Sequence, residues 1–253
     1  MVDIHCHLSH PPLEQIRESI VKKCRRLDIN YLVNSVTSLN KWESELNLIE
    51  PNVLLSLGIH PQSVKDIDYS YWLNQLENFT DSSRVVAVGE IGFDKYKFNT
   101  GYSVQEKIFL SQLEIAQSKS LPLVIHCRGY YHKLQNIIKQ KKITVPLILH
   151  RYTGGDGQVN AFAKLGCYFS FSADILNPRN KKTLNSIKAV PAGLILAETD
   201  APYFWENLKS RGTPCVLPRV ISVISEIKKI KNAKMREIID ENITHAFQGR
   251  IPV

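Results

Sequence analysis

The chain has 253 residues, of which 43% are hydrophobic and 22% charged, which excludes a disordered chain and suits a single domain over residues 1–253. Its net charge of +8 attracts polyanions such as nucleic acid, although charge alone favours the simpler interpretation of a solvated basic surface. Five scattered cysteines without a CxxC pair exclude a disulfide framework or a zinc ribbon, and they suit a reducing compartment.

Short apolar runs rich in β-branched residues recur along the chain and predict strands that are buried on both faces. The eight runs are Val2–His5, Tyr31–Val36, Val53–His60, Val85–Gly92, Leu121–Cys127, Pro146–Arg151, Gly166–Ala173 and Leu194–Asp200. Helical periodicity appears at Leu13–Leu27, Gln105–Ser118, Val220–Ile230 and Ala233–Phe247. Strands that alternate with helices over a chain of this length are typical of an α/β fold, the (β/α)₈ TIM barrel. A doubly wound open sheet is the alternative, but no GxGxxG motif follows the first run to support it.

Most histidines of the chain stand at the ends of predicted strands, where chance would scatter them among helices and loops. In a TIM barrel the active site lies at the C-terminal ends of the strands. His5 and His7 share one face of the first strand because residues i and i+2 point the same way, whereas Cys6 points to the other face. An isolated HxH pair more often marks surface histidines, but further candidate ligands end other strands, which favours a metal site.

Glu90 lies near the end of a very apolar strand, where an unpaired carboxylate is costly to bury. A metal ion would satisfy this side chain, and its two oxygen atoms allow it to bridge two ions. The competing interpretation is a buried ion pair with Arg128 or Arg151, which also follow strands. We favour the metal because histidines stand at equivalent positions on other strands.

Three further residues complete the predicted metal site. His126 and His150 each close an apolar strand, and Asp200 can bind a metal and accept a proton, although an Asp before Ala-Pro can also cap a turn. The predicted ligands are therefore His5, His7, Glu90, His126, His150 and Asp200. Six nitrogen and oxygen donors suit two divalent ions, and they permit Mg²⁺, Mn²⁺ or Zn²⁺.

These motifs, in chain order, make the chain resemble the TatD family of metal-dependent DNases, within the amidohydrolase-like superfamily of metal-binding barrels. The matching segments are Asp3–Leu8, Gly58–Pro61, Gly89–Asp94, Leu121–Arg128, His150 and Glu198–Tyr203. All of them together, at barrel spacing, are highly specific. The resemblance implies a (β/α)₈ barrel that binds one to three divalent ions and hydrolyses phosphodiester bonds in DNA, often from a 3′ end.

The resemblance also implies roles for individual residues. The six predicted ligands match the family's metal ligands, with Glu90 as the bridging carboxylate and Asp200 as the ligand that also serves as the base. His60 and Arg128 match family positions near the phosphate. Arg151 follows the sixth-strand histidine where the family commonly has Cys, so it adds a phosphate contact or obstructs one. We hypothesise that two ions activate water, Asp200 takes its proton, and the arginines stabilise phosphoryl charge.

The expected partner is DNA, single-stranded or with an accessible end, bound by a monomer in a salt-sensitive manner. Two other functions stay open. One is a hydrolase of the same barrel that acts on an amide, ester, lactone or other phosphoester. The other is a non-catalytic, metal-stabilised barrel that binds DNA or a partner. Glu90 favours the nuclease, because some relatives in the superfamily have a modified lysine at the corresponding place.

The sequence gives no sign of export or of a membrane. Polar His5, His7 and His10 occupy the position where a signal peptide requires an apolar stretch. The longest apolar runs are much shorter than a membrane span. We therefore expect a cytoplasmic protein.

Overall fold

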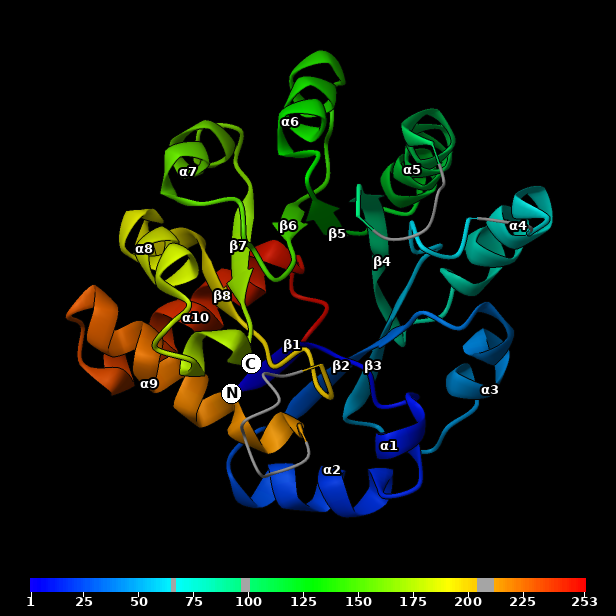
Figure 1. The fold of residues 1–253 in the computed structure, drawn as a ribbon. Coiled ribbons are helices and arrows are strands. Elements are labelled where there is room, and N and C mark those ends of the chain that lie inside the picture. Colours follow the sequence, from blue (N-terminus) through cyan, green and yellow to red (C-terminus); the bar gives the residue numbers. More distant parts are fainter. Residues whose placement is uncertain (65–66, 97–100, 204–211) are drawn as a thin grey trace.

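A computed structural model of the chain describes residues 1–64, 67–96, 101–203 and 212–253. Eight parallel strands form one sheet in chain order, and helices surround it as an outer layer (Figure 1). The strands are β1 (Val2–Cys6), β2 (Tyr31–Val36), β3 (Val53–Leu57), β4 (Val85–Asp94), β5 (Leu123–Arg128), β6 (Leu147–Leu149), β7 (Tyr168–Phe171) and β8 (Ile195–Ala197). This architecture confirms the predicted (β/α)₈ barrel.

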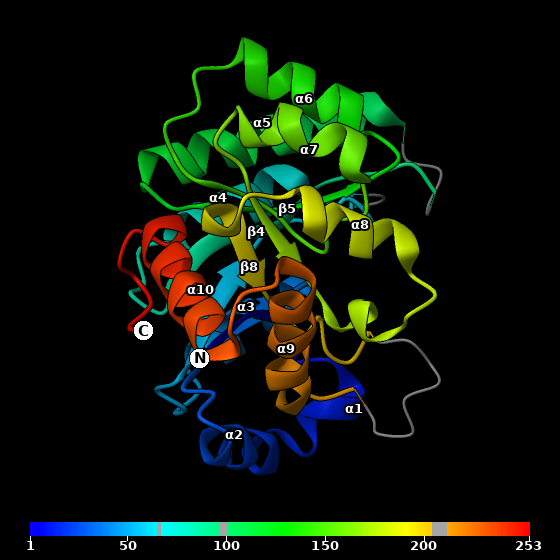
Figure 2. The ribbon, with the colours of Figure 1, turned by 90° about the vertical axis from the view of Figure 1, so that its left-hand side faces the viewer.

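The helices lie around the barrel wall, and the two ends of the chain lie near each other (Figure 2). They are α1 (Pro11–Glu14), α2 (Arg17–Arg26), α3 (Trp42–Leu46), α4 (Tyr69–Phe79), α5 (Tyr102–Ser118), α6 (Tyr131–Gln140), α7 (Asp156–Ala163), α8 (Lys181–Ala189), α9 (Leu217–Lys228) and α10 (Asn232–Ala246). Short 3₁₀ helices are η1 (Leu39–Lys41), η2 (Ala173–Leu176), η3 (Ala192–Leu194) and η4 (Pro214–Val216). Within the described residues, none of these helices combines the length and the apolar character that crossing a bilayer demands.

Several predicted boundaries need correction, and two of them have a clear local cause. The helix predicted over Leu13–Leu27 is two helices, because Ile16 has φ −118° and ψ 14°, outside the α region, and ends the continuity between α1 and α2. The strand predicted over Val53–His60 ends at Leu57. Beyond it, the Gln112 side chain accepts from the Ile59 N–H at 2.6 Å and donates to the Ile59 carbonyl at 3.2 Å, so this buried backbone bonds to a side chain.

The barrel closes where the first and the last strands meet. β7 pairs with β8, and the chain after β8 bonds to the end of β1. The Asp200 N–H donates to the His5 carbonyl at 2.9 Å, and the His7 N–H donates to the Ala201 carbonyl at 2.7 Å. These bonds fix the residues after β8 beside those at the end of β1.

A buried ion pair supports the segment that follows β1. Arg17 on α2 donates two hydrogen bonds to the Glu45 carboxylate on α3, one of them at 3.1 Å, and both side chains are buried. Asn34 on β2 donates to Glu45 at 2.8 Å and accepts from the Leu8 N–H at 2.8 Å. The pair thus connects two outer helices to the backbone beside His7.

We expect Arg17→Met to lower the free energy of unfolding by about 3–5 kcal/mol, because Glu45 stays buried without its cation. Urea denaturation measures the loss. The double variant Arg17→Met with Glu45→Met removes both charges and is expected to recover most of it. An unchanged denaturation midpoint in Arg17→Met would show that the pair contributes little.

Candidate metal centre

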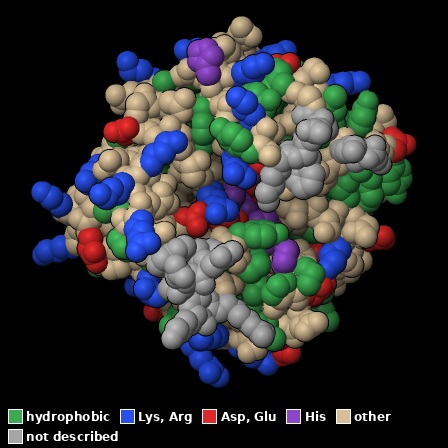
Figure 3. All heavy atoms as spheres, in the orientation of Figure 1, with side chains coloured by type: hydrophobic (Ala, Val, Ile, Leu, Met, Phe, Trp, Pro, Cys, Tyr) green, Lys and Arg blue, Asp and Glu red, His purple; other side chains and the backbone are tan. Residues whose placement is uncertain are grey.

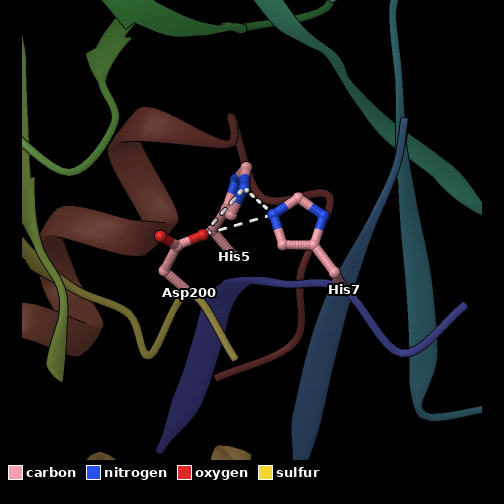
Figure 4. A group of neighbouring side chains, drawn as sticks. All are labelled: His5, His7 and Asp200. Atoms are coloured by element: carbon pink, nitrogen blue, oxygen red, sulfur yellow. Dashed lines mark hydrogen bonds and ion pairs between the residues drawn. The ribbon is translucent and has the colours of Figure 1, made fainter. Parts of the chain in front are cut away.

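His5, His7 and Asp200 point toward one another at the C-terminal mouth of the barrel (Figure 4). His5 belongs to β1, His7 follows it, and Asp200 follows β8. The Nε2 atoms of the two histidines are 3.3 Å apart, and His7 Nε2 lies 3.2 Å from Asp200 Oδ1. All three side chains are buried. The closure of the barrel therefore brings together donors from opposite ends of the chain.

Glu90 on β4 stands between this group and a second group of histidines. Its Oε2 atom lies 3.6 Å from His5 Nε2 and 4.0 Å from His7 Nε2. Its Oε1 atom faces three other ring nitrogens: His126 Nδ1 at 2.7 Å, His60 Nε2 at 3.3 Å and His150 Nε2 at 3.5 Å. The two oxygens of one carboxylate thus face different histidines.

Arg128 and Arg151, the alternative partners that the sequence suggested for Glu90, form ion pairs with other carboxylates. Arg128 Nη1 lies 3.6 Å from Asp94 Oδ2. Arg151 Nη1 donates to Asp200 Oδ2 at 2.8 Å. In the described part of the chain, the ion-pair contacts of Glu90 are with histidines. A buried Glu–Arg pair therefore does not explain Glu90.

Hydrogen bonds on the far side of two rings fix which nitrogen faces the site. His7 Nδ1 lies 2.9 Å from the Ser35 carbonyl oxygen, and His150 Nδ1 lies 3.1 Å from Glu198 Oε2. The Ser35 carbonyl oxygen can only accept, so His7 Nδ1 carries the proton and donates it. Burial raises the pKa of Glu198 to about 8, and His150 Nδ1 donates to Glu198 when that carboxylate is ionised. The Nε2 lone pairs then face the site, as metal binding requires.

At His5, His150 and Asp200 the surroundings favour the protonation states that bind metals. Burial lowers the pKa of His150 to about 4 and also lowers the pKa of His5, so both rings are neutral at pH 7. Burial disfavours the charged form of Asp200, but the contact with the His7 ring and the charge of Arg151 outweigh it and lower its pKa to about 2. Neutral imidazoles beside a carboxylate anion are suited to a divalent ion.

Against the effect of burial, the neighbouring Asp200 carboxylate raises the pKa of His7, and the pKa of His126 is shifted in the same direction. Burial opposes the charge of His126, but hydrogen bonds to Asp94 and Glu90 raise its pKa to about 9. Its Nε2 lies 3.0 Å from Asp94 Oδ2, and its Nδ1 contacts Glu90. The ring is therefore protonated at pH 7, and it must release a proton before either nitrogen binds a metal.

The donor distances test whether the site fits an ion. Ligand atoms about 2.1 Å from a tetrahedral ion lie about 3.4 Å from one another. His5 Nε2 and His7 Nε2 each lie 3.2–4.0 Å from the other three donors, which include Glu90 Oε2 and Asp200 Oδ1. These four donors, two nitrogens and two oxygens, therefore fit a divalent ion.

Two further triplets of donors lie beside the first. His60, Glu90 and His126 form one, and His5, His150 and Glu198 form the other, each with ligand atoms within 4.8 Å of one another. His60 was predicted to bind substrate, but it lies among the candidate ligands. The structure thus brings all six predicted ligands together and adds His60 to them.

Sequence reasoning assigned no role to three carboxylates that support these residues. Glu198 accepts from His150 Nδ1, from the Arg151 N–H at 2.9 Å and from Ser170 Oγ at 2.6 Å. Asp174 and Asp94 support site residues in the same way. Asp174 Oδ2 accepts from Arg151 Nε at 2.7 Å. Asp94 contacts His126 and Arg128. Their positions in the sequence could have indicated this role, because all three carboxylates lie at or just after the ends of strands.

Five of the six predicted ligands line a cavity of about 730 Å³, and the sixth, His5, is fully buried behind them. Figure 3 shows histidine side chains at its centre, with Lys and Arg side chains around them. Its lining includes His7, His60, Glu90, His126, Arg128, His150, Arg151, Asp174, Asp200 and Tyr203. The cavity is open, polar and charged, which suits an ionic substrate better than an apolar one.

Comparisons with known proteins agree with this geometry. Residues 2–248 match the family model described as TatD related DNase. An uncharacterized metal-dependent hydrolase of Mycoplasma genitalium is 31% identical, over 97% of this chain and 98% of that protein. The 3′-5′ ssDNA/RNA exonuclease TatD of Pectobacterium parmentieri is 28% identical, over 98% of this chain and 99% of that protein. The crystal structure of YjjV, a TatD homolog from Escherichia coli, is similar with a TM-score of 0.90 and 25% identity, over 98% of both chains.

Proposed function

The chain belongs to the family of TatD-related DNases, and we propose that it is a metal-dependent nuclease that hydrolyses phosphodiester bonds in DNA from a 3′ end. The observation that carries the proposal is Glu90, whose two oxygens face separate groups of histidines. One similar protein is named a 3′-5′ ssDNA/RNA exonuclease, which supports the polarity. Since this chain supplies every donor, we further propose that residues 1–253 form one domain that acts as a monomer.

We propose that two divalent ions, Mg²⁺, Mn²⁺ or Zn²⁺, bind at the mouth of the barrel. The first set of ligands is His5, His7, Glu90 and Asp200. The second set is Glu90, His126 and His150, with His60 beside them. When bound, such ions polarise phosphoryl oxygens and lower the pKa of water from about 15.7 to roughly 7, so that hydroxide is available at neutral pH.

The protein's own groups position the substrate and move the proton. Asp200 keeps its carboxylate charged at neutral pH and accepts the proton of the attacking water. Arg151 Nη1 and the backbone after β8 hold that carboxylate in place. Arg128 and Arg151 line the cavity and are partly exposed, so their guanidinium groups contact the phosphate and stabilise its charge.

A group of basic and aromatic side chains around Arg128, which itself lines the cavity, forms a rim that supports nucleic acid as the substrate class. The Arg128 guanidinium lies 5.7 Å from the centre of the Tyr96 ring, and Tyr96 is 68% exposed. Lys133 Nζ lies 3.7 Å from the centre of the Tyr102 ring. Proteins hold single-stranded nucleic acid on such surfaces, where stacking contributes about 1–3 kcal/mol per base. This rim favours a single-stranded end over an amide or lactone.

The test uses protein stripped of metal with a chelator and reloaded with one ion at a time. A single-stranded DNA oligonucleotide labelled at its 5′ end is expected to shorten stepwise, only with metal, and less at high salt. Matched RNA, duplex DNA and an oligonucleotide blocked at its 3′ end define the substrate. Turnover of p-nitrophenyl esters or a lactone, without cleavage of any nucleic acid, would instead identify a different hydrolase of this barrel. Metal-dependent DNA binding without turnover would identify a binding protein.

We expect Glu198→Gln to weaken metal binding by about 10–100-fold, because the amide nitrogen cannot accept from His150 Nδ1. Titration against a coloured chelator measures the affinity. Glu18→Gln is the matched control, since Glu18 is exposed on α2. Equal metal affinities in the two variants would show that Glu198 does not support metal binding.

A further inference from the structure

Two cysteines lie together on the outside of the barrel, away from the cavity. Cys24 is on α2 and Cys215 is in η4, and 191 residues separate them in the sequence. Their Sγ atoms are 3.7 Å apart. The segment before α9, which contains η4, lies against α2 (Figure 1). The fold thus brings two thiols together whose positions in the sequence do not suggest a pair.

We propose that Cys24 and Cys215 are a modification site, which forms a reversible intramolecular disulfide on exposure to a peroxide or a small-molecule disulfide. A disulfide requires the sulfurs to approach to about 2.05 Å, which side-chain rotation and a small shift of the short η4 segment allow. The other three cysteines, Cys6, Cys127 and Cys167, are buried, and none of them has a sulfur partner of this kind in the structure. The proposal is independent of the nuclease function.

The two thiols differ in a way that suits this chemistry. Cys24 is fully buried, whereas Cys215 is partly exposed and reachable by a small oxidant. A hydrogen bond from the Cys24 thiol lowers the pKa of Cys215, and Thr213 and Lys23 act in the same direction. Cys215 is therefore the attacking thiolate, and Cys24 is the resolving thiol.

With hydrogen peroxide, the Cys215 thiolate attacks one peroxide oxygen, the O–O bond breaks, and hydroxide leaves. Cys215 is then a sulfenic acid. The Cys24 sulfur attacks it, the S–S bond forms, and the oxygen leaves as water with the Cys24 proton. The two thiols lose two electrons, and the peroxide is reduced to two waters. With oxidised glutathione, two thiol–disulfide exchanges give the same bond and two glutathione thiols.

The disulfide would link the segment that follows the first strand to the segment that follows the last strand. α2 follows the segment that contains His5 and His7, and η4 lies on the chain that follows Asp200. Hydrogen bonds between those two segments already close the barrel near the candidate metal centre. A bond between Cys24 and Cys215 would fasten the same pair of segments covalently.

The experiment treats the full chain with hydrogen peroxide or with oxidised glutathione, blocks the remaining thiols, and cleaves after lysine. Cleavage yields the peptides 24–41 and 210–228, each with one cysteine. Mass spectrometry is expected to find them cross-linked, with two fewer blocked thiols in the chain and full reversal by dithiothreitol. Cys167→Ser, which removes a buried thiol elsewhere, is expected to keep the cross-link.

Cys24→Ser and Cys215→Ser are each expected to abolish the cross-link, and circular dichroism checks that they fold. Cys215 is partly exposed, so its replacement tests the proposal even if Cys24→Ser is unstable. The proposal is overturned if the folded wild-type chain keeps all its thiols under both oxidants. It is equally overturned if Cys215 ends as a sulfinic acid or a glutathione adduct without the cross-linked peptides.

Discussion

Replacing Asp200 with Asn is expected to slow DNA hydrolysis by about 10²–10⁴-fold, the range typical for loss of a general base. Asn has nearly the same shape but carries no charge and is a far weaker proton acceptor. It also removes an anionic donor at 3.2 Å from His7 Nε2. The expected defect therefore has two parts, a lost proton acceptor and weaker binding of the first ion.

Measurement at saturating metal separates these parts. A kcat that stays low when the metal concentration is raised reports the lost base, whereas a rate that recovers reports the lost ligand. Asp174→Asn is the matched control, because Asp174 also pairs with Arg151 but lies outside the candidate ligand clusters. Equal rates for wild type and Asp200→Asn at every metal concentration would exclude Asp200 as base and as ligand.

Arg151 both fixes the orientation of the Asp200 carboxylate and lowers its pKa, so that it is a weak base. The guanidinium lies 2.8 Å from Asp200 Oδ2, and its charge helps to keep the pKa of Asp200 at about 2. The carboxylate is therefore ionised at every pH at which the protein is expected to work. Phosphate bound to the guanidinium would neutralise part of that charge, and Asp200 would become more basic when substrate is present.

The sequence was sufficient to predict the barrel because buried parallel strands are continuous apolar runs. The run Tyr31–Val36 coincides with β2. Other runs overestimate their strands, as Leu194–Asp200 does for β8, which ends at Ala197. Hydropathy cannot mark such an end, because the residues beyond it stay buried at the mouth while their backbone leaves the sheet.

The candidate ligands were predictable for a related reason. His5 and His7 have the period of a strand, and polar residues at the ends of apolar runs are conspicuous. Their supporting contacts were not predictable, because they depend on tertiary pairing. Glu198 and His150 are 48 residues apart, and their bond depends on the neighbouring strands between them. The sequence likewise does not reveal that Arg151, with φ of 42°, turns toward Asp200.

Replacing Glu90 with Gln is expected to lower the number of bound metal ions per chain more than any other single substitution at the site. Its Oε2 faces His5 and His7, while its Oε1 faces the second group of histidines. Gln has one oxygen and an amide nitrogen that does not bind these ions, so at least one ion loses its shared anionic ligand. The expected loss of several kcal/mol of transition-state stabilisation corresponds to a rate about 10³-fold lower.

Metal content distinguishes this variant from Asp200→Asn. Asp200 Oδ1 lies 3.2 Å from His7 Nε2, closer than to His5 at 3.9 Å or to His150 at 3.8 Å, so its loss is expected to affect mainly the first ion. Elemental analysis after dialysis is therefore expected to find fewer ions per chain in Glu90→Gln than in Asp200→Asn, with Glu18→Gln equal to wild type. If Glu90→Gln retains the wild-type metal content, the carboxylate is not a bridge, and the two histidine groups bind their ions independently.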